Sequence, residues 1–172
     1  PHIFCHNSPM RHLTVSILVT LAVLLGSTGM SWGADFNKGV AAYDSGDFAT
    51  ALREFRPLAE KGDAYAQFTL GLMYVKGEGV PQDYKTAVKW YTLAAEQGDA
   101  NAQGNLGVKY AFGMGVLKDY VYAHMWGNIA AMNGNEKGGK LRDDFEKQMT
   151  PADISAAEKL ARECVAKNYK GC

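Results

Sequence analysis

Apolar positions in residues 61–96 follow the three- and four-residue spacing of amphipathic helices. Ala66, Leu70 and Tyr74 recur at four-residue steps and predict a first helix with one buried face. A second stripe with helical spacing predicts a second helix: Tyr84, Ala87, Val88, Tyr91, Ala94 and Ala95. The segment is therefore expected to form a helical hairpin, with a glycine-rich turn at positions 77–79.

The same pattern returns after 36 residues. Residues 61–96 align with residues 97–132, and 17 of the 36 positions are identical. The aspartates expected to cap the helix starts recur at this offset: Asp63, Asp99, Asp83 and Asp119. Because a lone hairpin cannot bury its apolar face, the two units are expected to stack on each other.

A shortened unit precedes the two full repeats. This degenerate unit spans residues 35–60. Its part from Asp47 to Glu60 matches the second helix of the repeat at the same offset, but the turn before that helix is brief, at Tyr43 to Gly46. The repeat region is therefore expected to extend over residues 34–134. We predict an all-α fold, a solenoid of stacked helix-turn-helix repeats.

Residues 135–172 are expected to close the solenoid as a capping helix pair followed by a tail. Positions 135–139 are predicted to be a loop. A short amphipathic helix should follow it, with Leu141, Phe145 and Met149 on its apolar face. The last helix should begin at Thr150-Pro151, because threonine is a favoured N-cap and proline suits the first turn.

The repeated motif resembles the Sel-one-like repeat (SLR) family, which is related to tetratricopeptide repeats. In the first full unit it is Ala-x-Ala-Gln-x-x-Leu-Gly-x-x-Tyr-x-x-Gly-x-Gly-Val-x-x-Asp-Tyr. The resemblance covers about residues 36–132 and implies a right-handed α-solenoid that acts as an adaptor for protein complexes, including at bacterial envelopes. The second unit departs from the first where Leu117 replaces Pro81 and Gly127 replaces Tyr91.

The first 33 residues carry a targeting pattern. Residues 10–33 are predicted to be a cleavable signal peptide, with a polar start, an apolar stretch from Leu13 to Leu25, and small residues near the cut. A retained membrane anchor is the alternative, but the apolar stretch is shorter than the roughly 20 residues that cross a bilayer. Residues 1–9 have no assigned role. The expected location is the periplasm or the exterior.

Export changes how the cysteines are interpreted. Cys5 precedes the signal, which leaves Cys164 and Cys172 as an even pair in an oxidising compartment. A disulfide between them is the preferred interpretation. A zinc site is disfavoured because His124 is the single histidine beyond the signal, and structural zinc usually takes four ligands. We therefore predict no metal and no cofactor.

The charge balance disfavours a nucleic-acid or anionic-membrane partner. The sequence has 18 basic and 18 acidic residues, and removal of Arg11 with the signal leaves 17 basic against 18 acidic. Such partners require clustered lysine and arginine. No membrane span is expected after cleavage.

Catalytic constellations are sparse in this sequence. His124 occupies the helix position of Val88 in the preceding repeat, so a packed histidine is favoured over a general base. Asp143, Asp144 and Glu146 are expected to form a solvated helix face instead of an acid–base pair. The alternative function is a cell-envelope hydrolase acting on β-lactams or peptidoglycan, as the resemblance suggests for cysteine-rich relatives.

Binding is the preferred function. Successive first helices of a solenoid line a concave groove, and positions that differ between repeats are free to recognise a partner. Drift without function is the alternative explanation for those differences. The predicted groove residues are Tyr65, Phe68, Thr69, Leu72, Asn101, Asn105 and Val108. We expect a non-catalytic scaffold for another protein or peptide.

Overall fold

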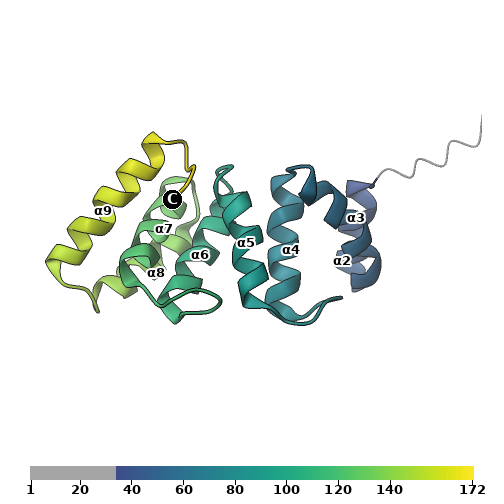
Figure 1. Cartoon of the computed structure of the whole chain (residues 1–172), viewed down its shortest axis with the longest axis horizontal. Helices are drawn as coiled ribbons and strands as arrows, with labels where there is room; N and C mark the ends of the chain where they lie inside the picture. The colour runs from purple at the N-terminus through teal and green to yellow at the C-terminus, as the bar shows by residue number, and fades with distance from the viewer. Residues whose placement is uncertain (1–33) are drawn as a thin grey trace, which may run out of the picture. The chain divides into compact units, whose positions relative to one another are not determined.

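The structure is a computed structural model that describes residues 34–172, so the predicted extension at 1–9 and signal at 10–33 lie outside the described residues. Within residues 34–172 the chain is helical and contains no strand (Figure 1). None of the helices described has the length and hydrophobicity to cross a membrane. The helices are α2 (Phe36–Ser45), α3 (Phe48–Glu60), α4 (Ala64–Lys76), α5 (Tyr84–Ala95), α6 (Ala100–Phe112), α7 (Tyr120–Met132), α8 (Glu136–Glu146) and α9 (Pro151–Ala166).

An aspartate caps the start of every helix from α2 to α7. Asp63 and Asp99 accept the backbone N–H groups of Ala66 and Ala102 at 2.8 and 2.7 Å. Asp83 and Asp119 each accept two backbone N–H groups at the starts of α5 and α7. These contacts satisfy donors that a helix leaves unpaired, so the predicted caps are confirmed.

Consecutive helices pack against one another to form the predicted α-solenoid. The hairpins are α2–α3, α4–α5 and α6–α7, and α3–α4 and α5–α6 contacts join them. Alanines supply much of the interface: Ala51, Ala59, Ala66, Ala87, Ala94, Ala95, Ala102, Ala123 and Ala130 are buried. Small side chains let the helix axes approach closely. A few large residues such as Tyr91 and Trp126 fill the remaining space in the core.

The glycine loops inside the two full repeats contact the unit before them. A Cβ at Gly79 would lie 2.8 Å from the carbonyl oxygen of Phe48, at the start of α3. At Gly115, 36 residues later, a Cβ would collide with the backbone of Tyr84 at the start of α5. Both glycines have positive φ, 71° and 83°. Glycine is therefore required twice over, by backbone conformation and by close contact.

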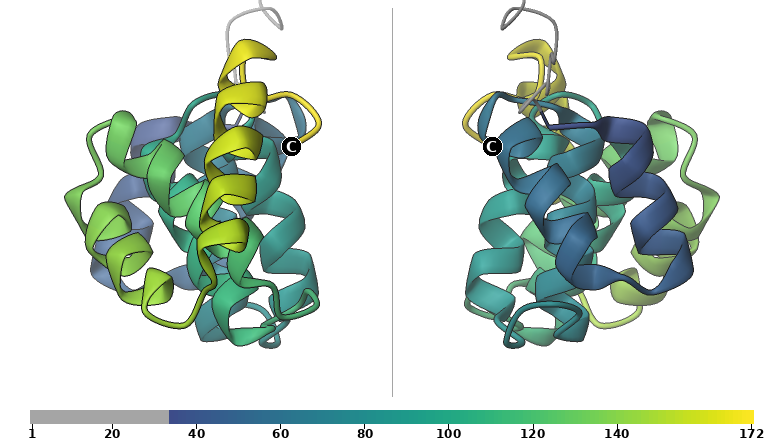
Figure 2. Two further views of the ribbon diagram at one scale, coloured as in Figure 1. Left: turned by 90° about the vertical axis from the view of Figure 1, so that its left-hand side faces the viewer. Right: turned by 90° about the vertical axis from the view of Figure 1, so that its right-hand side faces the viewer.

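The C-terminal helices pack chiefly on α7, not as a mutual hairpin. Helix α8 contacts α7 and α6, whereas α9 crosses α7 (Figure 2). The predicted start of the last helix is confirmed, because Thr150 and Asp153 form a capping box with Pro151 in the first turn.

The prediction of a loop at 135–139 is wrong. Asn135 caps α8, and the next residues are helical. A Cβ at Gly138 would lie 2.7 Å from Cβ of Ala130 on α7, and one at Gly139 would lie 3.2 Å from Cβ of Ala131. These glycines bring two helices together and do not mark a turn.

The tail after α9 folds back onto the repeats. A disulfide joins Cys164 in α9 to Cys172, with the sulfur atoms 2.11 Å apart. Within the closed loop, the Tyr169 hydroxyl donates to Oδ1 of Asn133 at 3.1 Å. The Gly171 N–H donates to Oε1 of Glu96 at 2.9 Å. The tail thus attaches the end of the chain to the C-terminal ends of α5 and α7.

Candidate peptide-binding groove

A surface cavity of about 230 Å³ is lined by residues of α4, α6 and α8 and by the α8 cap residue Asn135. Phe68 comes from α4, and Lys137, Gly138 and Leu141 come from α8. The lining residues are Phe68, Asn101, Gly104, Asn105, Val108, Asn135, Lys137, Gly138 and Leu141. Four of the seven predicted groove residues therefore meet at one cavity: Phe68, Asn101, Asn105 and Val108.

Gly104 opens this cavity and allows α8 to approach. The corresponding position in the preceding repeat is Phe68, 36 residues earlier. A Cβ at Gly104 would lie 3.1 Å from Nδ2 of Asn135. The loss of the aromatic side chain in the second full repeat thus gives Asn135 room to reach α6.

Asn135 fixes the polar side of the cavity. Its Nδ2 donates to the carbonyl oxygen of Ala100 at 3.0 Å and to Oδ1 of Asn101 at 3.1 Å. Its Oδ1 accepts the backbone N–H of Gly138 at 2.9 Å. These bonds use both sides of the amide, the nitrogen and the oxygen, and they orient Asn101 through its oxygen atom.

The three remaining predicted residues lie elsewhere. Tyr65 is 46% exposed, and its ring packs 5.2 Å from the ring of Phe36. Leu72 is half-buried against the main core cluster. Thr69 is only 3% exposed, so its prediction as a groove residue is wrong. A position that varies between repeats can face either the core or a partner. The sequence pattern does not distinguish these two cases.

The α8 residues of the cavity were missed from the sequence. The repeat pattern decays after Gly134, and the sequence of residues 135–139 predicts a loop. One signal was present: Gly134-Asn135 stands 36 residues after Gly98-Asp99, the glycine and cap that precede α6. This recurrence identifies the start of another first helix.

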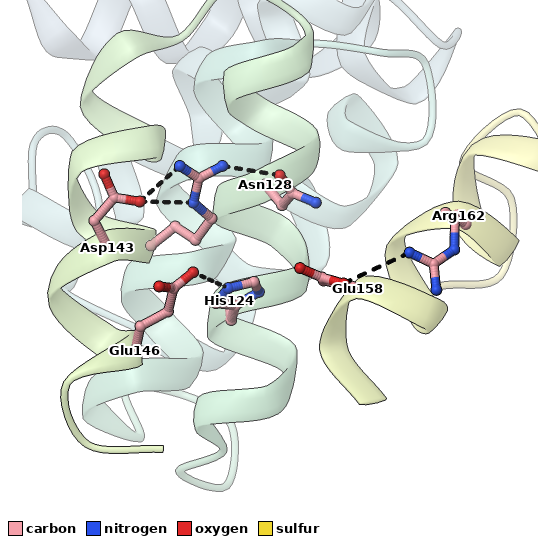
Figure 3. A network of polar contacts seen from close by, with 7 residues as sticks. His124, Asn128, Asp143, Glu146, Glu158 and Arg162 are labelled. Carbon is pink, nitrogen blue, oxygen red and sulfur yellow. Dashed lines mark hydrogen bonds and ion pairs between the residues drawn. The ribbon is translucent and has the colours of Figure 1, made fainter. Parts of the chain in front are cut away.

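His124 is packed inside the structure, as predicted. Its side chain lies between α7 and α8 with 1% exposure, and Nε2 is 2.7 Å from Oε1 of Glu146 (Figure 3). Nδ1 is buried and has no hydrogen-bond partner among the described residues. An imidazole that does not face solvent links two helices but has no path to a substrate proton.

Each acidic residue in the second half of α8 pairs with a different side chain. Asp143 pairs with Arg142 at 2.6 Å, and Asp144 pairs with Lys147 at 2.6 Å; both carboxylates are exposed. The predicted solvated face is confirmed for these two, whereas Glu146 binds His124 instead. Within residues 34–172, no group of three or more His, Cys, Asp and Glu side chains is placed to hold a metal.

A second cavity of about 470 Å³ lies between α7 and α9. Its lining is Asn128, Met132, Glu158, Ala161, Arg162, Val165 and Ala166. Glu158 and Arg162 form an ion pair of 3.7 Å at this cavity (Figure 3). The two charges compensate each other, and none of the predicted groove residues lies here.

Lys109 shows that a varying position can serve packing. It replaces Met73 of the preceding repeat and is buried, and this burial lowers the pKa of its amine. The Nζ atom lies 4.8 Å from the ring centroid of Tyr84. The ring partly compensates for lost hydration, so Lys109 belongs to the solenoid core and not to the cavity.

The stacked hairpins define an α-solenoid repeat protein. The Sel1 repeat family matches residues 64–99 and 100–135, two adjoining units with the 36-residue period found in the sequence. The chain therefore contains two Sel1 repeats.

Solved structures support the same assignment. A protective antigen present in uropathogenic Escherichia coli strains, which displays an SLR fold, is 33% identical with a TM-score of 0.73 over 77% of this chain. A Sel1 repeat protein from Oxalobacter formigenes is 32% identical with a TM-score of 0.60 over 63% of this chain. The matches cover 30% and 44% of those proteins, respectively. No curated protein matches the chain.

Proposed function

We propose that the protein is an exported scaffold that binds a segment of another protein, or a peptide, in the groove formed by α4, α6 and α8. The observation that carries this proposal is the 230 Å³ cavity at positions where the two Sel1 repeats differ. Shared positions such as Leu70 and Leu106 are buried and build the solenoid. Asn101 and Asn105 differ from their counterparts and stay accessible, as recognition residues do.

Export to the periplasm or beyond is part of the proposal. The disulfide between Cys164 and Cys172 supports it, because disulfides persist in oxidising compartments. The pattern in residues 10–33 supplies the targeting signal. Fractionation of cells, followed by sequencing of the protein's N-terminus, should place the chain outside the cytoplasm with a cut near Gly33.

The proposed role does not include catalysis. The single histidine in residues 34–172 is buried against Glu146, which leaves the groove without an imidazole base. The purified protein should therefore fail to turn over a chromogenic β-lactam or to release fragments from peptidoglycan. Turnover abolished by His124→Phe would instead favour the hydrolase.

A capture experiment tests the binding role. The protein is immobilised and exposed to envelope extract, and the retained proteins are identified by mass spectrometry. We compare a groove variant, Asn105→Ala with Val108→Ser, with a control variant, Leu93→Ala with Leu117→Ala. Leu93 and Leu117 are 44% and 90% exposed and lie outside both cavities described above.

The groove variant should lose its partner, whereas the control should retain it. Both should keep the helical circular dichroism of the wild type, since all four positions are at least partly exposed. Retention of the same partner by both variants would exclude this groove as the binding site.

A further inference from the structure

The cavity presents hydrogen-bond donors that the protein leaves unused. The oxygen of Asn101 accepts a hydrogen bond from Asn135, so the Nδ2 group of Asn101 is available to donate to a ligand. The amide of Asn105 and the ammonium of Lys137 form no hydrogen bond or ion pair with any residue in the 34–172 range. Three donor groups from two helices therefore line one small cavity.

The cavity is also unbalanced in charge. Lys137 is the one charged residue in its lining. The exposed carboxylates of Asp143 and Asp144 are already paired with Arg142 and Lys147. An anionic group thus finds a cation and no carboxylate in the cavity lining.

Apolar side chains form the rest of the wall. Phe68, Val108 and Leu141 come from three different helices and are half-buried. A volume of about 230 Å³ suits a single amino-acid residue and not a folded surface. The occupant should therefore carry an apolar group and an anionic group close together.

We propose that the cavity binds the last residue of a peptide, with its free C-terminal carboxylate on Asn101, Asn105 and Lys137 and its apolar side chain against Phe68, Val108 and Leu141. A chain-terminal residue carries both groups on one Cα. An internal glutamate or aspartate brings a carboxylate but no apolar side chain on the same residue. This inference rests on the proposed function, because it specifies which part of a partner enters the groove.

Fluorescence anisotropy with labelled hexapeptides tests the proposal. The peptides have five randomised positions and end in leucine, valine or phenylalanine. One pool carries a free C-terminal carboxylate, and a second carries a C-terminal amide. A third pool is amidated and carries an internal glutamate. The free-acid pool should bind at least about tenfold more tightly than either amidated pool, since charge-assisted hydrogen bonds are lost with the amide.

Variants locate the effect in the cavity. Lys137→Gln and Asn101→Asp should abolish the preference for the free acid. Lys140→Gln removes a neighbouring lysine from the same helix, outside the cavity lining, and should preserve it. All three positions are exposed, and thermal unfolding of each variant checks that the fold is intact.

The outcomes separate this inference from the proposed function. Equal binding of acid and amide pools, lost in the Asn105→Ala, Val108→Ser variant, overturns the carboxylate inference and leaves a peptide-binding groove. Equal binding of the acid pool and the internal-glutamate pool overturns it in favour of acidic side chains. If no pool binds, the inference fails, while the scaffold role is decided by capture from the envelope extract.

Discussion

Two buried glutamines hold the hairpins in register. Gln67 donates to the carbonyl oxygen of Ala59 at 3.0 Å, and Gln103 donates to that of Ala95 at 3.1 Å. The side-chain oxygen of each glutamine also accepts a hydrogen bond. The amide of Gln97 donates to Gln67 at 2.7 Å, and the amide of Asn133 donates to Gln103 at 2.8 Å. Each glutamine thus joins three successive helices, which apolar side chains cannot do with the same directional precision.

Gln103→Leu should lower the free energy of unfolding by about 1–3 kcal/mol, because the carbonyl of Ala95 loses its side-chain partner and the amide of Asn133 loses its acceptor. Urea denaturation measures the change. Gln82→Leu is the control, since the hydrogen bond of Gln82 to Val75 is exposed. The control should change stability by less than about 0.5 kcal/mol. If both variants lost the same free energy of unfolding, burial of the glutamine would not explain the effect.

At the residue scale, the sequence predicted part of the groove. It identified Asn101 and Asn105 because these positions break the repeat. It did not identify Lys137 and Leu141, because their helix lies beyond the region where the repeat is recognisable. It also placed Thr69 in the groove, since a variable position gives no sign of the direction in which its side chain points.

At the element scale, the loops inside the full repeats control how the hairpins stack. Gly79 lies against the start of α3, and Gly115 lies against the start of α5. The two contacts are 36 residues apart in the sequence. In each, the glycine lies against the first residue of the second helix of the preceding unit. A short turn would connect the helices equally well, but it would not reach the neighbouring unit. The extra length of these loops therefore contributes to stacking.

Gly115→Ala should be more destabilising than Gly62→Ala. Both glycines have positive φ, 83° and 100°, so alanine costs about 1–2 kcal/mol at either position. A Cβ at Gly62 meets nothing within 4 Å, whereas one at Gly115 meets the backbone of Tyr84. This collision should add about 1–3 kcal/mol. Equal midpoints in urea denaturation would show that the loop yields without cost.

Helix positions were easier to predict than helix contacts. Aspartate caps and apolar spacing located α4 to α7, because both signals are local in sequence. Because glycine is also a local signal for a turn, Gly138 and Gly139 predict a loop. Locally, a glycine that allows a turn and a glycine that allows two helices to touch look alike. The difference lies in Ala130 and Ala131 on α7, which only the folded chain brings near.

At the scale of the whole molecule, the disulfide-closed tail connects distant parts of the chain. Gly171 contacts Glu96, 75 positions earlier in the sequence. Lys170 lies 3.9 Å from the same carboxylate, and the Tyr169 ring lies near Gly98. These contacts reach the α5–α6 turn, before the last repeat, in addition to the hydrogen bond of Tyr169 with Asn133 at the end of α7.

Reduction of the disulfide should lower the free energy of unfolding by about 2–3 kcal/mol, the value expected for a short closed loop. Urea denaturation with and without reductant measures this change. The variant Cys164→Ser with Cys172→Ser should match the reduced wild type and should not respond to reductant. A wild type that reductant leaves unchanged would show that the other contacts of the tail suffice.

The attachment of the tail also affects how the array comes apart. Units at the end of a stack have neighbours on one side only, so they usually open first and independently. Here the final helix is linked through its tail to the α5–α6 turn, which precedes the last repeat. Its opening must therefore break contacts of the interior repeat as well, so hydrogen exchange in α9 should slow to the rates of α6 and α7.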